Sequence, residues 1–161
     1  MDNTPATTID RIAAISPEAL GKVRRLEDHL LTLPQVDLDT THVLHAGMYA
    51  RTIRVPAGVV FTGALIKVAS TLIISGDVVV TLGAKSSRLS GYHVLSCSAG
   101  RKQAFVTMGE TFITMIFPTT ADTVEQAEKE ATDEAGALAS HRNSAKNTII
   151  ITEERPCRMQ Q

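Results

Sequence analysis

Between Val55 and Pro118 the chain consists of short β-branched runs separated by glycine, among them GVVFTG, STLIISG, DVVVTLG and QAFVTMGETFITMIFP. Turn signals recur about every 8 to 12 residues, which is typical of an antiparallel sandwich or barrel. A chain of 161 residues suits one domain with its own core. The pattern therefore predicts a single, mainly β domain whose barrel spans residues 41–118.

Helical patterns flank this predicted barrel on both sides. Ser16 followed by Pro17 is typical of a helix start, and the apolar spacing of three and four then predicts a helix over residues 17–34. Residues 122–142 form the second pattern, an acidic helix whose early glutamates suit the positive end of the helix dipole. Its apolar seam is thin, so we expect it to be weakly held by its own barrel and to pack on a neighbour.

The two ends of the chain differ in character. Residues 1–16 are small and polar, and we expect a flexible or partner-ordered arm. Residues 146–161 contain the isolated, strongly β-forming run TIIIT, Thr148–Thr152. A terminal strand of this kind pairs with a sheet edge, in its own chain or in a neighbour's.

Composition excludes several function classes. A formal net charge of −1, with dispersed Lys and Arg, gives no basic face for nucleic acid. The most apolar run, Val68 to Leu82, is interrupted by Ser, Thr, Gly and Asp, so we expect no membrane-spanning helix. The first residues lack the basic start and apolar run of a signal peptide, so we expect no secretion by that route. Cys97 and Cys157 are expected to be free thiols.

The glycine order resembles that of the cupin superfamily. Gly58 and Gly91 open two segments that resemble the two cupin motifs. The resemblance implies an antiparallel jelly-roll barrel, and in its metal-binding members three histidines and a carboxylate. At those positions this chain has Ala64, Ile66 and Ser70, followed by Lys102 or Gln103. Alkyl groups donate no lone pair to a metal, so the sequence predicts no metal and no cofactor.

A narrower resemblance covers roughly residues 34–142. The phrases VPAG, AGRKQAF and TMIFPT together resemble a group of small cupin-like proteins encoded by tailed phages and prophages. This resemblance implies a location in the virion or the host cytoplasm, with other phage structural proteins as partners. We therefore expect a non-enzymatic structural or assembly protein that forms a homo-oligomer, because its helices and last strand are suited to protein contacts.

The alternative is a metal-independent cupin that binds a small molecule or sugar, including an isomerase or epimerase with a His base and a Tyr acid. Tyr92 and His93 are adjacent, so on a strand only one of them can enter the barrel. Other polar candidates for the interior are Tyr49, Arg51, Lys67, Arg101, Lys102 and Gln103. This alternative requires a polar cavity, whereas the structural hypothesis expects a barrel filled by Ile66, Leu72, Ile74, Phe105 and Phe112.

Overall fold

The structure is a computed structural model that describes residues 11–142 and 144–152. Its strands are β1 (Arg11–Ile12), β2 (Asp39–His45), β3 (Met48–Val55), β4 (Val60–Thr62), β5 (Ser70–Leu82), β6 (Lys85–Cys97), β7 (Ala104–Thr107), β8 (Thr111–Pro118) and β9 (Lys146–Ile151). Its helices are α1 (Pro17–Leu30), α2 (Val124–Ala131) and the short 3₁₀ segments η1 (Ala135–Ala137) and η2 (Ala139–His141). The predicted fold class is confirmed: a mainly β chain with a helix before the barrel and an acidic helix and a strand after it.

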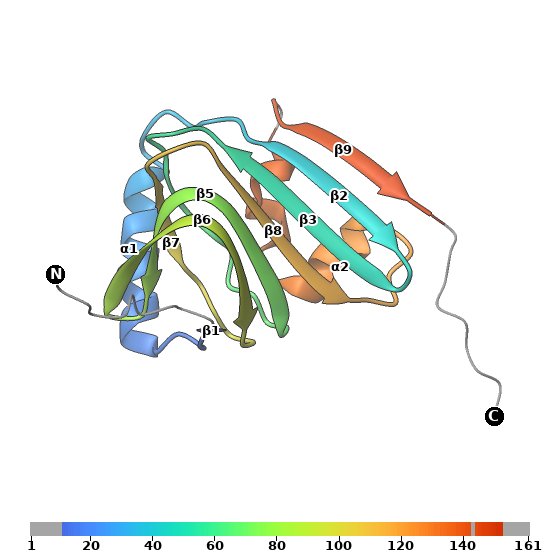
Figure 1. The fold of residues 1–161 in the computed structure, drawn as a ribbon, viewed down its shortest axis with the longest axis horizontal. Coiled ribbons are helices and arrows are strands. Elements are labelled where there is room, and N and C mark those ends of the chain that lie inside the picture. Colours follow the sequence, from blue (N-terminus) through green and yellow to red (C-terminus); the bar gives the residue numbers. More distant parts are fainter. Residues whose placement is uncertain (1–10, 143, 153–161) are drawn as a thin grey trace, which may run out of the picture.

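The strands form one strongly curved sheet in the order β1-β6-β5-β8-β3-β2-β9, and β7 connects β5 to β4. Every pairing is antiparallel except β1 with β6 and β2 with β9. Residues 71–75 of β5 pair with β8, whereas residues 78–80 pair with β7. The long strand β5 therefore belongs to both walls of a jelly-roll barrel, and Figure 1 shows β5 and β6 arching between those walls.

The arch occurs at two glycines that face each other in the β5–β6 ladder, Gly76 and Gly91. Both have positive φ angles, +148° and +88°, which L side chains rarely adopt. The hydroxyl of Thr111 lies beside this bend, accepting from the backbone N–H of Asp77 and lying 3.2 Å from its carbonyl oxygen. A Gly-Asp dipeptide is typical of a tight turn or bulge, but the chain continues through Gly76 and Asp77 as one bent strand.

The connection at residues 108–110 is not a hairpin, although the alternating runs on either side of Met108-Gly109-Glu110 are typical of one. β7 pairs with β4 and β5, whereas β8 pairs with β3 and β5. The physical reason is the bend of β5, because its two halves point in different directions and each takes one of these strands. The turn between β7 and β8 therefore crosses from one wall of the barrel to the other.

Both ends of the described chain are joined to the sheet. Ile12 is buried and β1 pairs with β6, so the last part of the predicted arm is ordered; residues 1–10 of that arm lie outside the described residues. At the other end β9 pairs in parallel with β2 of the same chain (Figure 1). Of the predicted tail, residues 153–161 lie outside the described part.

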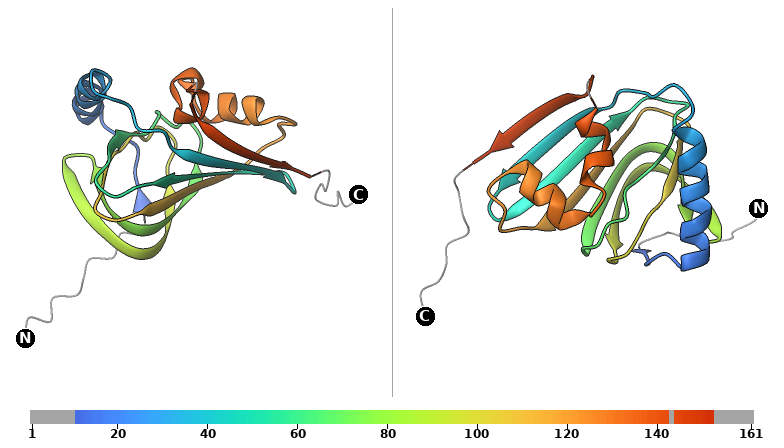
Figure 2. Two further views of the ribbon diagram at one scale, coloured as in Figure 1. Left: turned by 90° about the horizontal axis from the view of Figure 1, so that it is seen from above. Right: turned by 180° about the vertical axis from the view of Figure 1, so that it is seen from behind.

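Helix α1 ends at Leu30, before the predicted end at Pro34. Its C-terminal carbonyl groups are bound by local donors, since the hydroxyl of Thr32 donates to the carbonyl of His29 and the amide of Gln35 donates to that of Leu30. The helix lies along one side of the barrel (Figure 2) and buries Ala19 and Val23.

The acidic segment is helical only as far as Ala131, rather than through residue 142. Thr132 adopts an extended conformation, and the two 3₁₀ segments follow it. Ala127 and Ala131 are buried against Leu44, Tyr49 and Phe117, so this helix packs on the sheet of its own chain (Figure 2). Our expectation that it would be weakly held was wrong, because alanines allow a close approach to the aromatic rings. In the described part of the chain, neither helix has the length and apolarity needed to cross a membrane.

Candidate functional site: a cavity in the barrel

The barrel contains a cavity of about 570 Å³. Its walls come from the inner face of the sheet, from the loop after α1, from residues 58–64 and from η1 and η2. Most of the lining is apolar, including Ile53, Leu72, Phe105, Ile113 and Met115. A cavity of this size and character lies within the range of small-molecule sites.

The expectation of a filled barrel is therefore met only in part. Ile74 is fully buried in the apolar core, whereas Ile66, Leu72 and Phe105 are buried as predicted but also line the cavity. Phe112 pairs with Ser75 and Arg54 on the outer face of the sheet, where it is 42% exposed. The arch of β5 separates the two walls, so side chains of ordinary length leave space between them.

Arg101 is a buried cation on the cavity wall, with 4% exposure. A backbone bridge to Ile66 holds the residue in place. Its guanidinium donates to the Oε1 atom of Gln103 and the Oγ atom of Ser70, both at 3.0 Å, and its Nε has no hydrogen-bond partner among the described residues. Burial lowers the pKa of Arg101, and no described carboxylate pairs with it.

Arg51 is a second cation on the same wall. In the sheet register it lies between His42 on β2 and Met115 on β8, with its side chain on the inner face. Its guanidinium makes a long hydrogen bond, 3.5 Å from Nη2 to the Oγ atom of Ser140. Burial lowers the pKa of Arg51, so its charge is poorly solvated.

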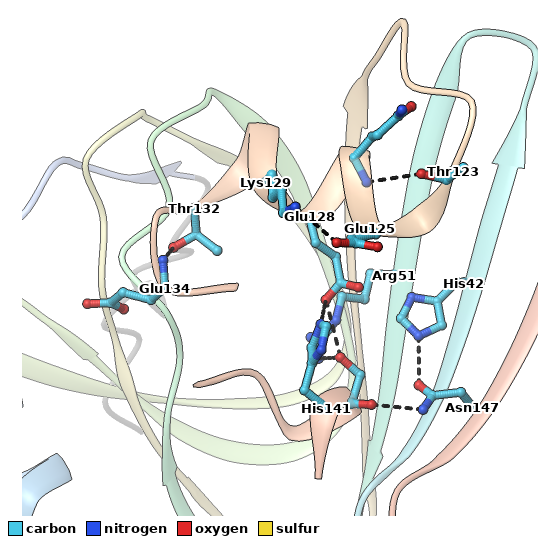
Figure 3. Close-up of polar contacts among 12 residues, drawn as sticks. His42, Arg51, Thr123, Glu125, Glu128, Lys129, Thr132, Glu134, His141 and Asn147 are labelled. Atoms are coloured by element: carbon cyan, nitrogen blue, oxygen red, sulfur yellow. Dashed lines mark hydrogen bonds and ion pairs between the residues drawn. The ribbon is translucent and has the colours of Figure 1, made fainter. Parts of the chain in front are cut away.

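Glu128 projects from α2 toward the same region (Figure 3). It is buried, accepts a hydrogen bond from the hydroxyl of Ser140 at 3.3 Å and lies 3.1 Å from the Nε2 atom of His141. Its nearest partners are therefore Ser140 and His141, and its carboxylate does not form an ion pair with Arg51.

His42 and Tyr49 form a hydrogen-bonded pair at the edge of the cavity. The amide nitrogen of Asn147 donates to the carbonyl of Ser140, so its Oδ1 atom is the acceptor that faces the Nε2 of His42 at 2.8 Å (Figure 3). His42 is thus the Nε2–H tautomer, and its Nδ1 accepts the hydroxyl proton of Tyr49 at 2.7 Å. Burial lowers the pKa of His42 and raises that of Tyr49.

This pair is not available for proton transfer to a ligand in the observed arrangement. Tyr49 has 0% exposure, and its hydroxyl proton is donated to His42. His42 itself does not line the cavity. The pair instead connects β2, β3 and, through Asn147, β9.

A group of charged residues, which we call the ion cluster, closes the cavity on the side of α1; it consists of Arg24, Glu27, Lys102 and Glu134. The side chain of Lys102 is 0% exposed, and its Nζ lies 2.7 Å from the carboxylate of Glu27 and 3.2 Å from that of Glu134. Glu134 also pairs with Arg24 at 2.8 Å and accepts from the backbone N–H of Leu65 at 2.9 Å. The cluster connects α1, the barrel and the segment after α2.

Of the polar residues predicted as candidates for the barrel interior, three line the cavity: Tyr49, Arg51 and Arg101. Lys102 is buried behind the wall in the ion cluster, and Gln103 supports Arg101. The other candidates lie elsewhere: Tyr92 is 68% exposed, His93 bonds the carbonyl of Ser90, and Lys67 pairs with Asp133.

The sequence reasoning missed Glu128, Ser140 and His141. Their only local signal was an acidic helical pattern, which is also typical of a solvated surface. Within residues 11–142 and 144–152, no three His, Cys, Asp or Glu side chains are grouped closely enough to hold a metal ion.

Comparison with known proteins finds similarity among solved structures only. No family model matches the chain, and no curated protein matches it. Solved structures similar to it include a cupin-2 domain protein from Shewanella frigidimarina, with 13% identity, a TM-score of 0.42 and coverage of 62% of this chain and 97% of the other. A cupin superfamily protein from Desulfitobacterium hafniense has 13% identity and a TM-score of 0.43, covering 54% and 84%. KdgF from Halomonas sp. has 15% identity and a TM-score of 0.44, covering 55% and 85%.

Proposed function

We propose that this protein binds a small molecule in the barrel cavity. The observation that carries the proposal is the cavity itself, about 570 Å³ with apolar walls and a few buried polar groups. Pockets of about 300–1,000 Å³ with such a lining are typical of specific ligand sites. We propose binding rather than catalysis, because Tyr49 on the cavity wall and its partner His42 satisfy each other's hydrogen bonds.

Binding is tested with the neutral, apolar fluorophore N-phenyl-1-naphthylamine. Ala64 lines the cavity, so we expect Ala64→Trp to fill part of it and weaken the affinity for the dye at least about tenfold. The measurement is a fluorescence titration of dye with wild-type and variant protein.

Ala84→Trp is the matched control, because Ala84 is exposed at the tip of the β5–β6 hairpin, away from the cavity. It should leave the affinity unchanged. A wild-type protein that does not bind the dye, or equal binding by both variants, would remove the support for a ligand in the barrel.

A second candidate function is self-assembly through β9, as in the structural component of a phage or prophage particle. The observation that favours it is the exposed edge of the sheet. β9 ends the strand order, and its residues Ile149, Ile150 and Ile151 are 55%, 47% and 53% exposed. A second copy of β9, related by a two-fold axis, would supply complementary backbone groups.

This candidate predicts that the wild type is a dimer or larger, and that Ile149→Lys with Ile151→Lys produces monomers, since lysine on an edge strand opposes pairing. The measurement is size-exclusion chromatography with light scattering. Val94→Lys serves as the control, because Val94 is 53% exposed on β6, at a different place in the sheet. A monomeric wild type at high micromolar concentration would contradict the assembly proposal and leave the cavity proposal intact.

A further inference from the structure

We infer that the ligand of the cavity is a carboxylic acid with an apolar body, and that Arg51 and Arg101 hold its carboxylate. The inference rests on the proposed binding function and names the ligand class. It is carried by two guanidinium groups on an apolar wall that form no ion pair with a carboxylate of the described residues. The charge of Glu128 acts on Arg51 only from a longer distance.

The charges around the cavity do not balance. The charged residues in its lining are Glu27, Arg51, Arg101, Glu128, Glu134 and Arg142. Glu27 and Glu134 are matched by Lys102 and Arg24 of the ion cluster. The three arginines in the lining then face one remaining carboxylate, that of Glu128, which itself pairs with His141. Even with a neutral His141, one carboxylate faces three guanidinium groups, so the cavity is electropositive.

The environment of Arg101 indicates where an anion would bind. Its Nη atoms donate to an amide and a hydroxyl oxygen, which are neutral acceptors. A buried cation without a counter-ion is unfavourable, and the penalty is relieved when an anion binds beside it. Gln103 and Ser70 hold the guanidinium in a fixed position, and a fixed planar guanidinium suits bidentate recognition of a carboxylate.

Arg51, on β3, lines the same cavity. It pairs in register with Met115, which pairs with Leu72. Neighbouring strands lie about 4.8 Å apart, so the Cα atoms of Arg51 and Leu72 are separated by about 10 Å. Arg101 reaches Ser70, which is on the same strand as Leu72. The extended side chain of Arg51 can cover much of this distance, and a carboxylate between the two guanidinium groups would cover the rest. Leu72, Ile113 and Phe105, which line the cavity, would contact the apolar body.

The surroundings favour a single negative charge. Glu128 lines the same cavity and would repel a second charge on the ligand, and the apolar walls would not solvate it. A monocarboxylate therefore fits this site better than a phosphate dianion.

The test compares 2-naphthoate with 2-naphthamide, which have nearly the same shape and differ in charge, as displacers of N-phenyl-1-naphthylamine. Wild-type protein should bind the carboxylate at least about tenfold more tightly than the amide. Arg101→Gln and Arg51→Gln should each reduce that ratio toward one while the dye still binds. Arg88→Gln is the control, because Arg88 is exposed and pairs with Asp77 outside the cavity.

If a variant fails to fold, the ratio of the wild-type affinities for 2-naphthoate and 2-naphthamide decides the inference. Equal affinity of wild type for naphthoate and naphthamide, with dye binding intact, would overturn the carboxylate assignment but not the proposed function. Absence of dye binding would remove both. Tighter displacement by 2-naphthyl phosphate than by naphthoate would overturn the preference for a monoanion.

Discussion

Replacing Gly76 with alanine is expected to destabilise the protein by at least about 3 kcal/mol, the combined cost of backbone strain and overpacking. A Cβ atom at this position would lie 2.5 Å from the carbonyl oxygen of Glu110 and 2.6 Å from the Cα of Thr111. Both are backbone atoms, which cannot rotate away. The φ angle of +148° adds strain, because L residues rarely adopt it.

The effect is large because Gly76 lies where β5 passes from β8 to β7. The turn between β7 and β8 is fixed here, since the backbone N–H groups of Met108 and Gly109 both donate to the carbonyl of Asp77. Moving this turn to admit a methyl group would disturb both walls of the barrel. Thermal unfolding followed by circular dichroism should show a midpoint lower by about 6 °C or more.

Substitutions at two other glycines distinguish the cost of backbone strain from the cost of steric overlap. Gly91 has φ +88° but no described neighbour within 4 Å of its Cβ position, so Gly91→Ala should cost about 1–2 kcal/mol from strain alone. Gly109 lacks a positive φ, and its Cβ would meet Asp77 at an ordinary 3.5 Å, so Gly109→Ala should be nearly neutral. If Gly76→Ala is no worse than Gly91→Ala, the arch does not depend on close packing at Gly76.

The fold class could be predicted because β-branched runs, glycine spacing and helix caps are local signals. Ser16 and Thr123, for example, cap α1 and α2, with each side chain accepting the N–H three residues later. The arch could not be predicted in the same way. Gly76-Asp77 fits a turn, a bulge or a bent strand equally well, and only the contacts with Thr111 distinguish them.

The candidate site, like the fold, could be predicted from the sequence only in part. Tyr49, Arg51 and Ile53 alternate along one strand, so their common face follows from the period of two. The cavity that they line depends on the separation of two walls and on the loop after α1, which are non-local features. The place of Lys102 was unpredictable for another reason: its partners Glu27 and Glu134 come from segments far away in the sequence.

Replacing Lys102 with methionine is expected to destabilise the protein by about 3 kcal/mol, at the lower end of the range for breaking a buried ion pair. Methionine fills a similar volume, so the loss is mainly one of charge. Glu27 and Glu134 would lose their shared cation, although both retain some solvent contact, with side-chain exposures of 28% and 24%. Urea unfolding near neutral pH measures the change.

Lys129→Met is the matched control. Lys129 pairs with Glu125 on the exposed face of α2, and both side chains are more than half exposed. Such a surface pair contributes little to stability, because solvent screens it. An equal effect of the two substitutions would show that the ion cluster does not connect α1 to the barrel energetically.

The pH dependence distinguishes charge from packing in the Lys102 variant. Burial by itself would raise the pKa of Glu134, but the N–H of Leu65, Arg24 and Lys102 together lower it. A carboxylate with a depressed pKa contributes stability that is present above its unfolded pKa, about 4.3, and is lost as the pH falls through the folded value. Lys102→Met removes part of this contribution. The difference in unfolding free energy between wild type and variant should therefore have its full size at neutral pH and become smaller near pH 4 and below. A difference that stays constant down to that pH would assign the loss to packing and contradict an electrostatic role for Lys102.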